Sequence, residues 1–184
     1  MLPPFTENGC LPAGTYSMTF DQLRESTLVL GPGDPASCPH WDAAWRERLT
    51  RSAESLVNEL WQVGVTNVFL DGSFVEDKDH PNDIDGYFEC SIESLASGEL
   101  QRQLNRLNLH KIWTWDPASR RAYRGYAKLQ LPMWHQYRVE FYPHAVGITS
   151  GITDEWGNDL EFPAAFRRTR RDGKPKGIIQ IQSG

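Results

Sequence analysis

The feature that most constrains the fold is the segment Asp83–Cys90 (DIDGYFEC), in which two kinds of side chain alternate. Its even positions are apolar or small, and its odd positions are acidic or polar. Because successive side chains of a strand point to opposite faces, this period of two predicts a β-strand with one face toward a core. The other face carries Asp83 and Asp85, so we expect a sheet with acidic groups on one side.

Other patterns along the chain predict both helices and strands. Apolar residues at spacings of three or four predict a helix over 41–63, which ends at Gly64, and a mostly helical stretch over 91–108. Further strands are expected at 67–72, 135–142 and in the terminal GIIQIQ, and a Thr-x-x-Gln capping box predicts a short helix near Phe20. The fold class expected is α/β (α+β), a small mixed β-sheet flanked by helices.

The length of 184 residues is that of one compact domain. We expect residues 1–40 to be an arm and a short helix packed on the core, 41–145 to be the core, and 146–184 to be a C-terminal extension with a basic segment. No stretch approaches the ~20 apolar residues that span a bilayer, so no membrane partner is expected. Three scattered cysteines and no recognisable secretory leader favour a reducing, cytoplasmic location.

The two aspartates form a candidate metal site. Two residues apart on one strand, Asp83 and Asp85 point the same way, with Cα atoms about 6.6 Å apart. If the carboxylates approach to about 4 Å, their repulsion is about 4 kcal/mol at an effective dielectric constant near 20, and a divalent cation such as Mg²⁺ relieves it. A calcium-binding EF-hand is excluded because Pro81 and Ile92 would occupy two required ligand positions. A solvated acidic strand face that needs no metal stays an alternative.

Two other segments can complete such a site. Gly72 and Ser73 follow the strand expected at 67–72, and a Gly-Ser turn lets backbone N–H groups and a hydroxyl approach a phosphate. Glu140 lies on the strand expected at 135–142. If that strand pairs with Asp83–Cys90, the strand spacing of about 4.8 Å brings the third carboxylate beside the first two. Three carboxylates can bind divalent metal and accept a proton from an attacking hydroxyl.

The pattern Gly72-Ser73, nine residues, Asp83-Ile84-Asp85 and a later acidic strand resembles the DNA polymerase β-type nucleotidyltransferase superfamily. The short chain resembles its minimal bacterial members, which include enzymes of toxin–antitoxin and phage-defence systems. The resemblance covers about residues 42–142, with the closing RRDGKPKGI adding a family-like ending. It implies a nucleotidyltransferase-like fold and transfer of an NMP group from an NTP, such as ATP, to a hydroxyl of RNA, protein or a small molecule.

The resemblance also implies roles for individual residues. Asp83 and Asp85 would bind Mg²⁺ or Mn²⁺ that bridges the triphosphate, and Gly72 and Ser73 would hold the phosphates. Glu140 would complete the metal site and orient or deprotonate the acceptor hydroxyl. The hydroxyl would attack the α-phosphorus in line and release pyrophosphate.

The sequence departs from the family pattern around these residues. Gly86 stands where the family usually has an apolar residue, and acidic residues at 76, 77 and 79 surround Lys78, the one cation there that attracts a triphosphate. Arg138, on the face expected for Glu140, can bind a phosphate or simply neutralise that glutamate. The alternative function is therefore a catalytically inactive binding partner, such as an antitoxin-like subunit with a cognate toxin.

A basic segment lies near the C-terminus of a chain whose net charge is -5. That charge argues against a generally basic protein that coats duplex nucleic acid, but it allows a local basic patch. One hypothesis is a clamp for nucleotide phosphate or for an RNA acceptor such as tRNA; the alternative is a solvated turn around Asp172. The cations of this segment are Arg167, Arg168, Arg170, Arg171, Lys174 and Lys176.

Overall fold

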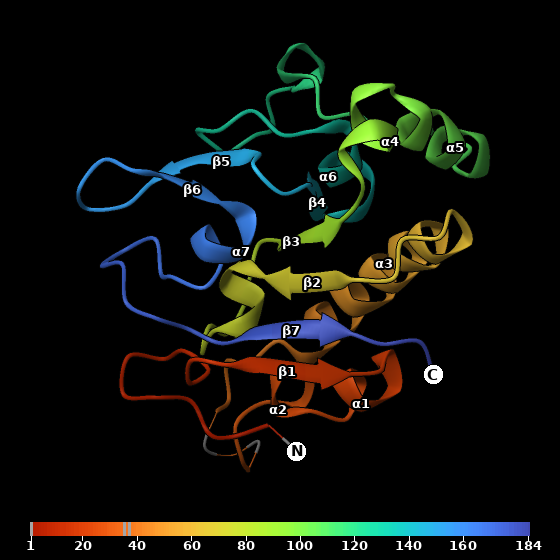
Figure 1. Ribbon diagram of the computed structural model, residues 1–184. Coiled ribbons are helices and arrows are strands. Elements are labelled where there is room, and N and C mark those ends of the chain that lie inside the picture. The colour runs from red at the N-terminus through yellow and green to blue at the C-terminus, as the bar shows by residue number, and fades with distance from the viewer. Residues whose placement is uncertain (1, 35, 37) are drawn as a thin grey trace.

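The computed structural model describes residues 2–34, 36 and 38–184, and its centre is a five-stranded sheet (Figure 1). Strand β2 runs antiparallel to β3 and β7, whereas β3–β4 and β1–β7 are parallel, so the sheet is mixed. A separate hairpin joins β5 (Thr149–Thr153) and β6 (Asp159–Glu161). In spatial order the sheet strands are β1 (Thr15–Met18), β7 (Ile178–Ile181), β2 (Val68–Asp71), β3 (Ile84–Glu89) and β4 (Val139–His144).

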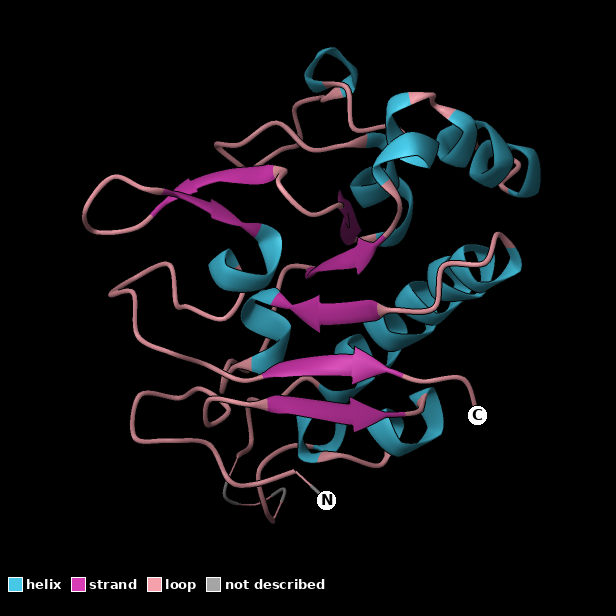
Figure 2. Cartoon of the chain, viewed as in Figure 1, coloured by secondary structure: helices cyan, strands magenta, loops and turns pink. Residues whose placement is uncertain are grey.

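Helices flank this sheet, which confirms the expected fold class of a mixed sheet flanked by helices (Figure 2). None of the described helices is long and apolar enough to cross a membrane. The helices are α1 (Phe20–Arg24), α2 (Thr27–Leu30), α3 (Ala43–Gln62), α4 (Ile92–Ala96), α5 (Glu99–Leu107), α6 (Pro132–Tyr137) and α7 (Phe162–Ala165), with 3-10 turns η1 (Gly72–Val75) and η2 (Pro117–Ser119).

Helix α3 covers one face of the sheet and supplies much of the main core. Its predicted apolar stripe is confirmed, because Leu49, Ala53, Leu56 and Leu60 are all buried. Burying a leucine side chain contributes about 1.5–3 kcal/mol, so this stripe fixes the helix against the sheet. Gly64 follows the helix with φ +84°, the left-handed conformation expected at a helix end.

Strand β3 alternates as the sequence predicted, but both of its faces are covered. Ile84 and Phe88 lie in the main core with the helices. On the opposite face Tyr87 is buried in a second cluster with Phe69, Phe166 and Ile178. The C-terminal part of the chain therefore covers the middle of the face expected to carry acid, whereas Asp85 is half-buried and Glu89, at the other end of the strand, is exposed.

Gly86 on the same strand is required by packing. A Cβ atom at this position would collide with the carbonyl oxygen of Phe69 and would lie 2.7 Å from the Phe141 ring. The glycine that departs from the family pattern therefore has a local cause, since Phe141 of β4 occupies the space of the missing side chain.

Two predicted elements differ from the structure. The strand expected at 135–142 is wrong in its first half: helix α6 extends to Tyr137, Arg138 adopts a left-handed φ of +57°, and β4 starts only at Val139. The helical stretch expected at 91–108 is divided into α4 and α5 at Ser97 and Gly98. Arg138 is consequently a helix-terminating residue and does not share a strand face with Glu140.

The sheet draws strands from all three segments distinguished in the sequence, and it is not confined to residues 41–145. Strand β1 comes from the N-terminal arm and β7 from the C-terminal extension. Figure 1 shows β7 lying between β1 and β2, so the end of the chain forms an interior strand of the sheet. The three segments therefore form one folding unit.

Candidate functional site

Three carboxylates lie side by side on the adjacent strands β2, β3 and β4. Asp71 of β2 is paired in register with Asp85 of β3, and Asp85 is paired with Glu140 of β4. The predicted pairing of the Glu140 strand with Asp83–Cys90 is confirmed. Because neighbouring strands are about 4.8 Å apart, the sheet itself brings these acidic groups together at one end.

The Gly72-Ser73 turn is pressed against this row. It opens η1 directly after β2, and Gly72 has φ +75°. A Cβ atom on Gly72 would lie 2.8 Å from Oδ2 of Asp85. Only glycine combines this backbone conformation with so close an approach, so the backbone of the turn and the carboxylate of Asp85 border the same space.

A buried arginine of α3 holds the loop that follows the turn. Arg46 is fully buried, and its guanidinium stacks on Trp41 with 4.0 Å between Cζ and the ring centroid. Burial lowers the pKa of Arg46 to about 9, so the group stays charged at neutral pH. Its two terminal nitrogens donate hydrogen bonds of 2.6–3.0 Å to the carbonyl oxygens of Leu28, Phe74, Glu76 and Lys78.

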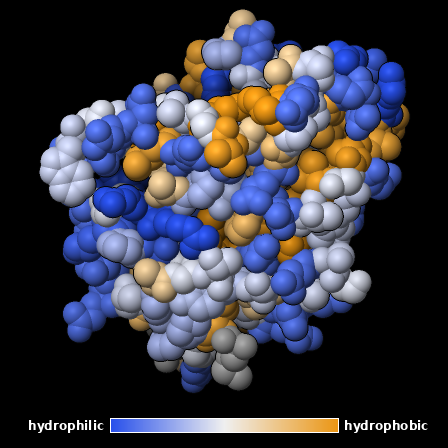
Figure 3. Space-filling model, viewed as in Figure 1, coloured by the Kyte–Doolittle hydropathy of each residue, from blue (hydrophilic) through white to orange (hydrophobic). Residues whose placement is uncertain are grey.

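These elements enclose a cleft of about 490 Å³, a size typical of small-molecule sites. Its lining includes Gly72, Ser73, Lys78, Asp83 and Asp85, five residues of the predicted site. In Figure 3 the corresponding end of the molecule, at the left, is mostly hydrophilic, whereas apolar atoms gather over α4 and α5. Other residues of the lining are Asp71, Glu76, Asn82, Tyr126, Lys128, Gln130, Ile152, Ala165, Phe166, Arg168, Arg170, Arg171 and Lys176.

Asp83 and Asp85 carry poorly compensated negative charge in this cleft. Burial raises the pKa of Asp85 to about 6, and repulsion from Asp83 adds to the rise. Burial also raises the pKa of Asp83, although Nε1 of Trp134 donates a 2.7 Å hydrogen bond to its Oδ2. The only ion pair of Asp85 within the described chain is with Arg170, at 3.9 Å. A cation in the cleft would relieve this repulsion.

Glu140, in contrast, is already satisfied by the protein. It is 1% exposed, and its Oε1 accepts a 2.9 Å hydrogen bond from the backbone N–H of Leu131. Nη1 of Arg120 lies 3.4 Å from Oε1, Nζ of Lys128 lies 3.5 Å from Oε2, and the Tyr142 hydroxyl donates to Oε2. Burial and the charge of Glu140 raise the pKa of Tyr142, so its proton stays on the phenol.

Asp71 is paired with a lysine from the basic segment. Nζ of Lys176 lies 3.1 Å from Oδ1 of Asp71, 3.1 Å from Oε1 of Glu76 and 3.3 Å from the carbonyl oxygen of Gly72. Burial nevertheless raises the pKa of Asp71 to about 7, against the opposing effect of Lys176. Lys176 is 4% exposed, so it fixes the C-terminal segment to the glycine turn and is not an open clamp residue.

The other basic residues divide into two groups. Arg168, Arg170 and Arg171 line the cleft, as a phosphate clamp requires. Arg167 lies apart from them, with Nη2 donating a 2.8 Å hydrogen bond to the Thr15 hydroxyl. Lys174 forms a 3.0 Å ion pair with Asp172 at the turn, as expected for a solvated turn.

The expectation that Arg138 binds nucleotide is corrected. Its guanidinium lies over the Trp134 ring, 3.9 Å from the centroid, and 4.3 Å from the centroid of Tyr123. The cation–π contacts occupy the group, and Arg138 is not among the cleft-lining residues. The helix end at Arg138 turns its side chain onto α6 and away from Glu140.

Sequence reasoning missed several groups that shape the site. Asp71 stands directly before Gly72 in LDGS, so its place at the end of a buried strand could have identified it. Arg120 and Lys128 come from a segment without regular periodicity, and only the folded chain brings them to Glu140. Arg46 lies on a helix whose apolar stripe gave no reason to expect a buried cation.

The described residues contain no cluster of three or more His, Cys, Asp or Glu side chains arranged to hold a metal ion. Their donors nevertheless fit a divalent cation in part. Asp83 and Asp85 offer hard oxygen ligands with unrelieved charge, while Glu140 has both oxygens engaged by protein donors. The residues suited to a metal are therefore the two aspartates.

No curated protein and no solved structure matches this chain. One protein family does: residues 3–182, nearly the whole chain, match the profile of the "Family of unknown function (DUF6932)". That range includes every strand of the sheet and every residue that lines the cleft. The chain therefore belongs to the DUF6932 family.

Proposed function

We propose that the protein is a nucleotidyltransferase that moves an NMP group from an NTP to a hydroxyl acceptor, with Mg²⁺ or Mn²⁺ bound at Asp83 and Asp85. One observation carries the proposal: the glycine turn lies against Asp85, and the turn, Asp83 and Asp85 all line one cleft. The strand register that places Glu140 beside Asp85 also agrees with the nucleotidyltransferase-like arrangement implied by the sequence.

Each group of the cleft has a role in this proposal. The backbone of Gly72 and the hydroxyl of Ser73 bind phosphate oxygens, and Lys78 adds a positive charge at the rim. The metal ion supplies neutralisation of the phosphate charge. Asp83 and Asp85 hold the ion, and fixing the donor and acceptor in the cleft supplies much of the rate enhancement by orientation.

Glu140 takes a different role from the one implied by the resemblance. Because protein donors engage both of its oxygens, Glu140 acts as a positioning residue that pairs with Arg120 and holds Lys128 at the edge of the cleft. These cations compensate the charge of the phosphates in the cleft. The acceptor hydroxyl belongs to an RNA such as tRNA, a protein or a small molecule, and the setting is a cytoplasmic toxin–antitoxin or defence system.

A second candidate function is an inactive nucleotidyltransferase-like subunit that binds a cognate toxin or antitoxin. The neutralised Glu140 favours it, since two cations and two hydrogen bonds occupy a carboxylate that catalysis would use. Arg170 beside Asp85 points in the same direction, because it places a positive charge where a metal would lie.

The test uses purified protein, each of the four NTPs labelled at the α-phosphate, Mg²⁺ and a cell lysate as the acceptor source. Wild type should transfer label, and Asp83→Asn and Asp85→Asn should reduce transfer at least a hundredfold. The matched control is Asp21→Asn, which changes a surface aspartate on α1 that does not line the cleft. This variant should keep full transfer. Transfer that survives both site substitutions would contradict the proposal.

A measurement of metal binding separates the two candidates. Mg²⁺ at about 100 times its dissociation constant should stabilise wild type by about 2.7 kcal/mol, and thermal unfolding reports this shift. Asp85→Asn should lose it and Asp21→Asn should retain it. A chain that neither transfers label nor responds to Mg²⁺, and that co-purifies with a fixed partner, supports the inactive subunit.

A further inference from the structure

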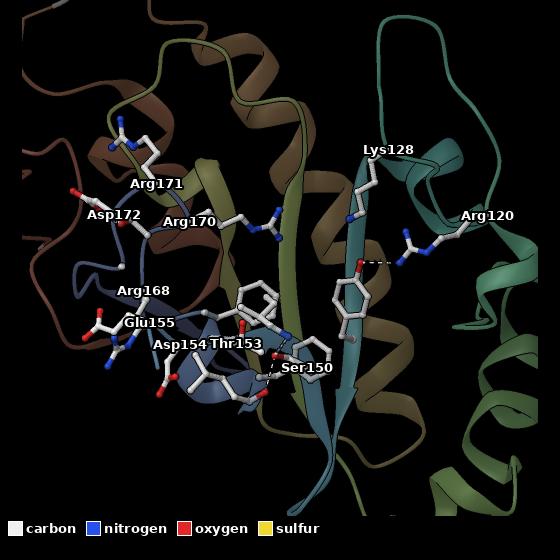
Figure 4. A pocket seen from close by; sticks show the side chains of 18 residues that line it. Arg120, Lys128, Ser150, Thr153, Asp154, Glu155, Arg168, Arg170, Arg171 and Asp172 are labelled. Carbon is white, nitrogen blue, oxygen red and sulfur yellow. Dashed lines mark hydrogen bonds between the residues drawn. The ribbon is translucent and has the colours of Figure 1, made fainter. Parts of the chain in front are cut away.

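A second, larger pocket of about 740 Å³ adjoins the cleft (Figure 4). We call it the aromatic pocket; it lies between the β5–β6 hairpin, α7 and the basic segment. Seven residues line both the cleft and this pocket: Lys128, Ile152, Ala165, Phe166, Arg168, Arg170 and Arg171. A ligand in the aromatic pocket would therefore lie next to whatever occupies the cleft.

The floor of the aromatic pocket is a column of stacked rings. Tyr142 and Phe162 stack with centroids 5.2 Å apart at 17°, and Phe162 and Phe166 stack at 5.7 Å and 20°. Ile152 adds an exposed aliphatic side chain beside them. An apolar, ring-rich floor of this kind suits a flat heteroaromatic group, which gains dispersion contacts and loses little hydration.

Cations stand at the side of the pocket nearest the cleft. In Figure 4 the side chains of Arg170 and Lys128 point toward one another from opposite sides, above the rings. Arg170 is 66% exposed and Lys128 is 54% exposed, so both retain room for an anion. Arg120 lies beyond Lys128, and its Nη2 donates a 3.2 Å hydrogen bond to the Tyr142 hydroxyl, which orients the guanidinium.

The opposite side of the pocket has a different charge. There Asp154, Glu155 and Asp172 stand with Arg168 and Arg171, two arginines that also line the cleft (Figure 4). Acidic and basic side chains roughly balance on this outer side, whereas the inner side is basic. A nucleic-acid strand that continued outward would bring its phosphates to these carboxylates, and that repulsion favours a ligand whose phosphate lies only on the inner side.

We propose that the aromatic pocket binds a nucleoside monophosphate, with its base against Phe162 and Ile152 and its phosphate between Arg170 and Lys128. The ring floor accounts for the base, the inner cations for the phosphate, and the carboxylates on the outer side for the small size of the ligand. The assignment of this nucleotide as the hydroxyl acceptor rests on the proposed function, but its binding does not.

Isothermal titration calorimetry with AMP, GMP, CMP and UMP in EDTA tests the pocket without metal. At least one nucleotide should bind, and ribose 5-phosphate, which lacks the base, should bind at least tenfold more weakly. Phe162→Leu keeps an apolar side chain but removes the ring, and Arg170→Ala removes the inner cation; each should weaken binding roughly tenfold. Arg51→Ala, an exposed arginine on α3, is the matched control and should bind as wild type.

Ile152→Thr, on the exposed hairpin, is the second floor variant in case Phe162→Leu folds poorly. Nucleotide affinity unchanged in Arg170→Ala and in either floor variant would overturn the proposal, as would equal affinity for ribose 5-phosphate. Tighter binding of a single-stranded oligonucleotide than of any monophosphate would overturn the small-ligand class in favour of a polymer. Because EDTA removes divalent metal and calorimetry measures binding without transfer, failure of the transfer assay and failure of this proposal are distinguishable.

Discussion

Asp85 is the residue at which the fold and the proposed chemistry conflict. The sheet register places it between Asp71 and Glu140, and the Gly72 turn closes over it. A fold selected for stability alone would not bury a carboxylate between two others, because desolvation and repulsion both oppose its charge. Lys176 compensates Asp71, and Arg120 and Lys128 compensate Glu140, so the least compensated charge is on Asp85, which has only the 3.9 Å ion pair with Arg170 among the described residues.

This imbalance predicts how stability depends on pH in metal-free buffer. The pKa of Asp85 is about 6 in the folded chain and 3.8 ordinarily, so the folded state holds its proton more tightly. The resulting stabilisation is fully present below about pH 4 and is lost as pH rises through about 6. Asp85→Asn removes the buried charge, so at pH 7 the variant should exceed wild type by roughly 1–3 kcal/mol in the free energy of unfolding.

Urea unfolding at pH 4 and pH 7 measures that difference. The advantage of Asp85→Asn should be much smaller at pH 4, where wild-type Asp85 is protonated. Asp21→Asn, whose carboxylate is almost fully exposed, serves as the control and should show no such pH dependence. If Asp85→Asn exceeded wild type by the same free energy of unfolding at both pH values, the charge of Asp85 would not be the cause of the difference.

Among single residues, those with a local pattern could be predicted and those that depend on distant partners could not. The alternation of side chains along the strand predicts Asp83 and Asp85 as site residues, and the position of the glycine turn after a strand predicts the turn. Arg138 illustrates the opposite case: its alternating surroundings read as a strand, but Pro132 begins a helix there and Arg138 ends it. No local pattern reveals that its guanidinium packs on Trp134.

At the scale of elements, α3 does more than cover the sheet. Its N-terminal turns hold the whole connection between the glycine turn and β3, because Nε1 of Trp45 donates a 2.6 Å hydrogen bond to the Pro81 carbonyl oxygen and Arg46 binds three carbonyls of the loop. This connection carries Lys78 to the rim of the cleft. The helix was predictable from its apolar stripe, but its function as a support was not, since a stripe says nothing of the polar groups beside it.

Arg46→Met tests this support. The substitution keeps a flexible side chain but leaves two buried and two partly buried carbonyl oxygens without their donor, so we expect a loss of about 3–5 kcal/mol in the free energy of unfolding. Chemical denaturation measures the loss, and proteolysis should cut the variant first within residues 76–82. The control is Arg48→Met, which replaces an exposed arginine two residues along the same helix. It should lower the free energy of unfolding by less than about 1 kcal/mol. Equal losses in the two variants would show that Arg46 has no special role.

For the whole molecule, the strand order β1-β7-β2 is the property that could least be predicted from the sequence. The local patterns predicted most of the strands and their flanking helices, because each element has its own period. Which strands become neighbours depends on contacts between residues more than a hundred positions apart, and no local period encodes them. The terminal GIIQIQ predicts a short strand or docking segment, yet its strand β7 lies inside the sheet, between β1 and β2.

That position makes a sharp prediction about truncation. Ending the chain at Lys176 removes β7, the strand that pairs with both β1 and β2. The loss also exposes the buried side chains of Leu70 and Val68 on β2. We expect this variant to be insoluble or to show the circular dichroism and urea response of an unfolded chain, because an interior strand cannot be lost from a five-stranded sheet. Ending the chain at Gln182 removes only Ser183 and Gly184, beyond the last strand, and should leave the unfolding midpoint within about 1 °C of wild type. A folded, nucleotide-binding chain ending at Lys176 would mean that the core is complete without its C-terminal strand and that the site forms on residues upstream of β7 alone.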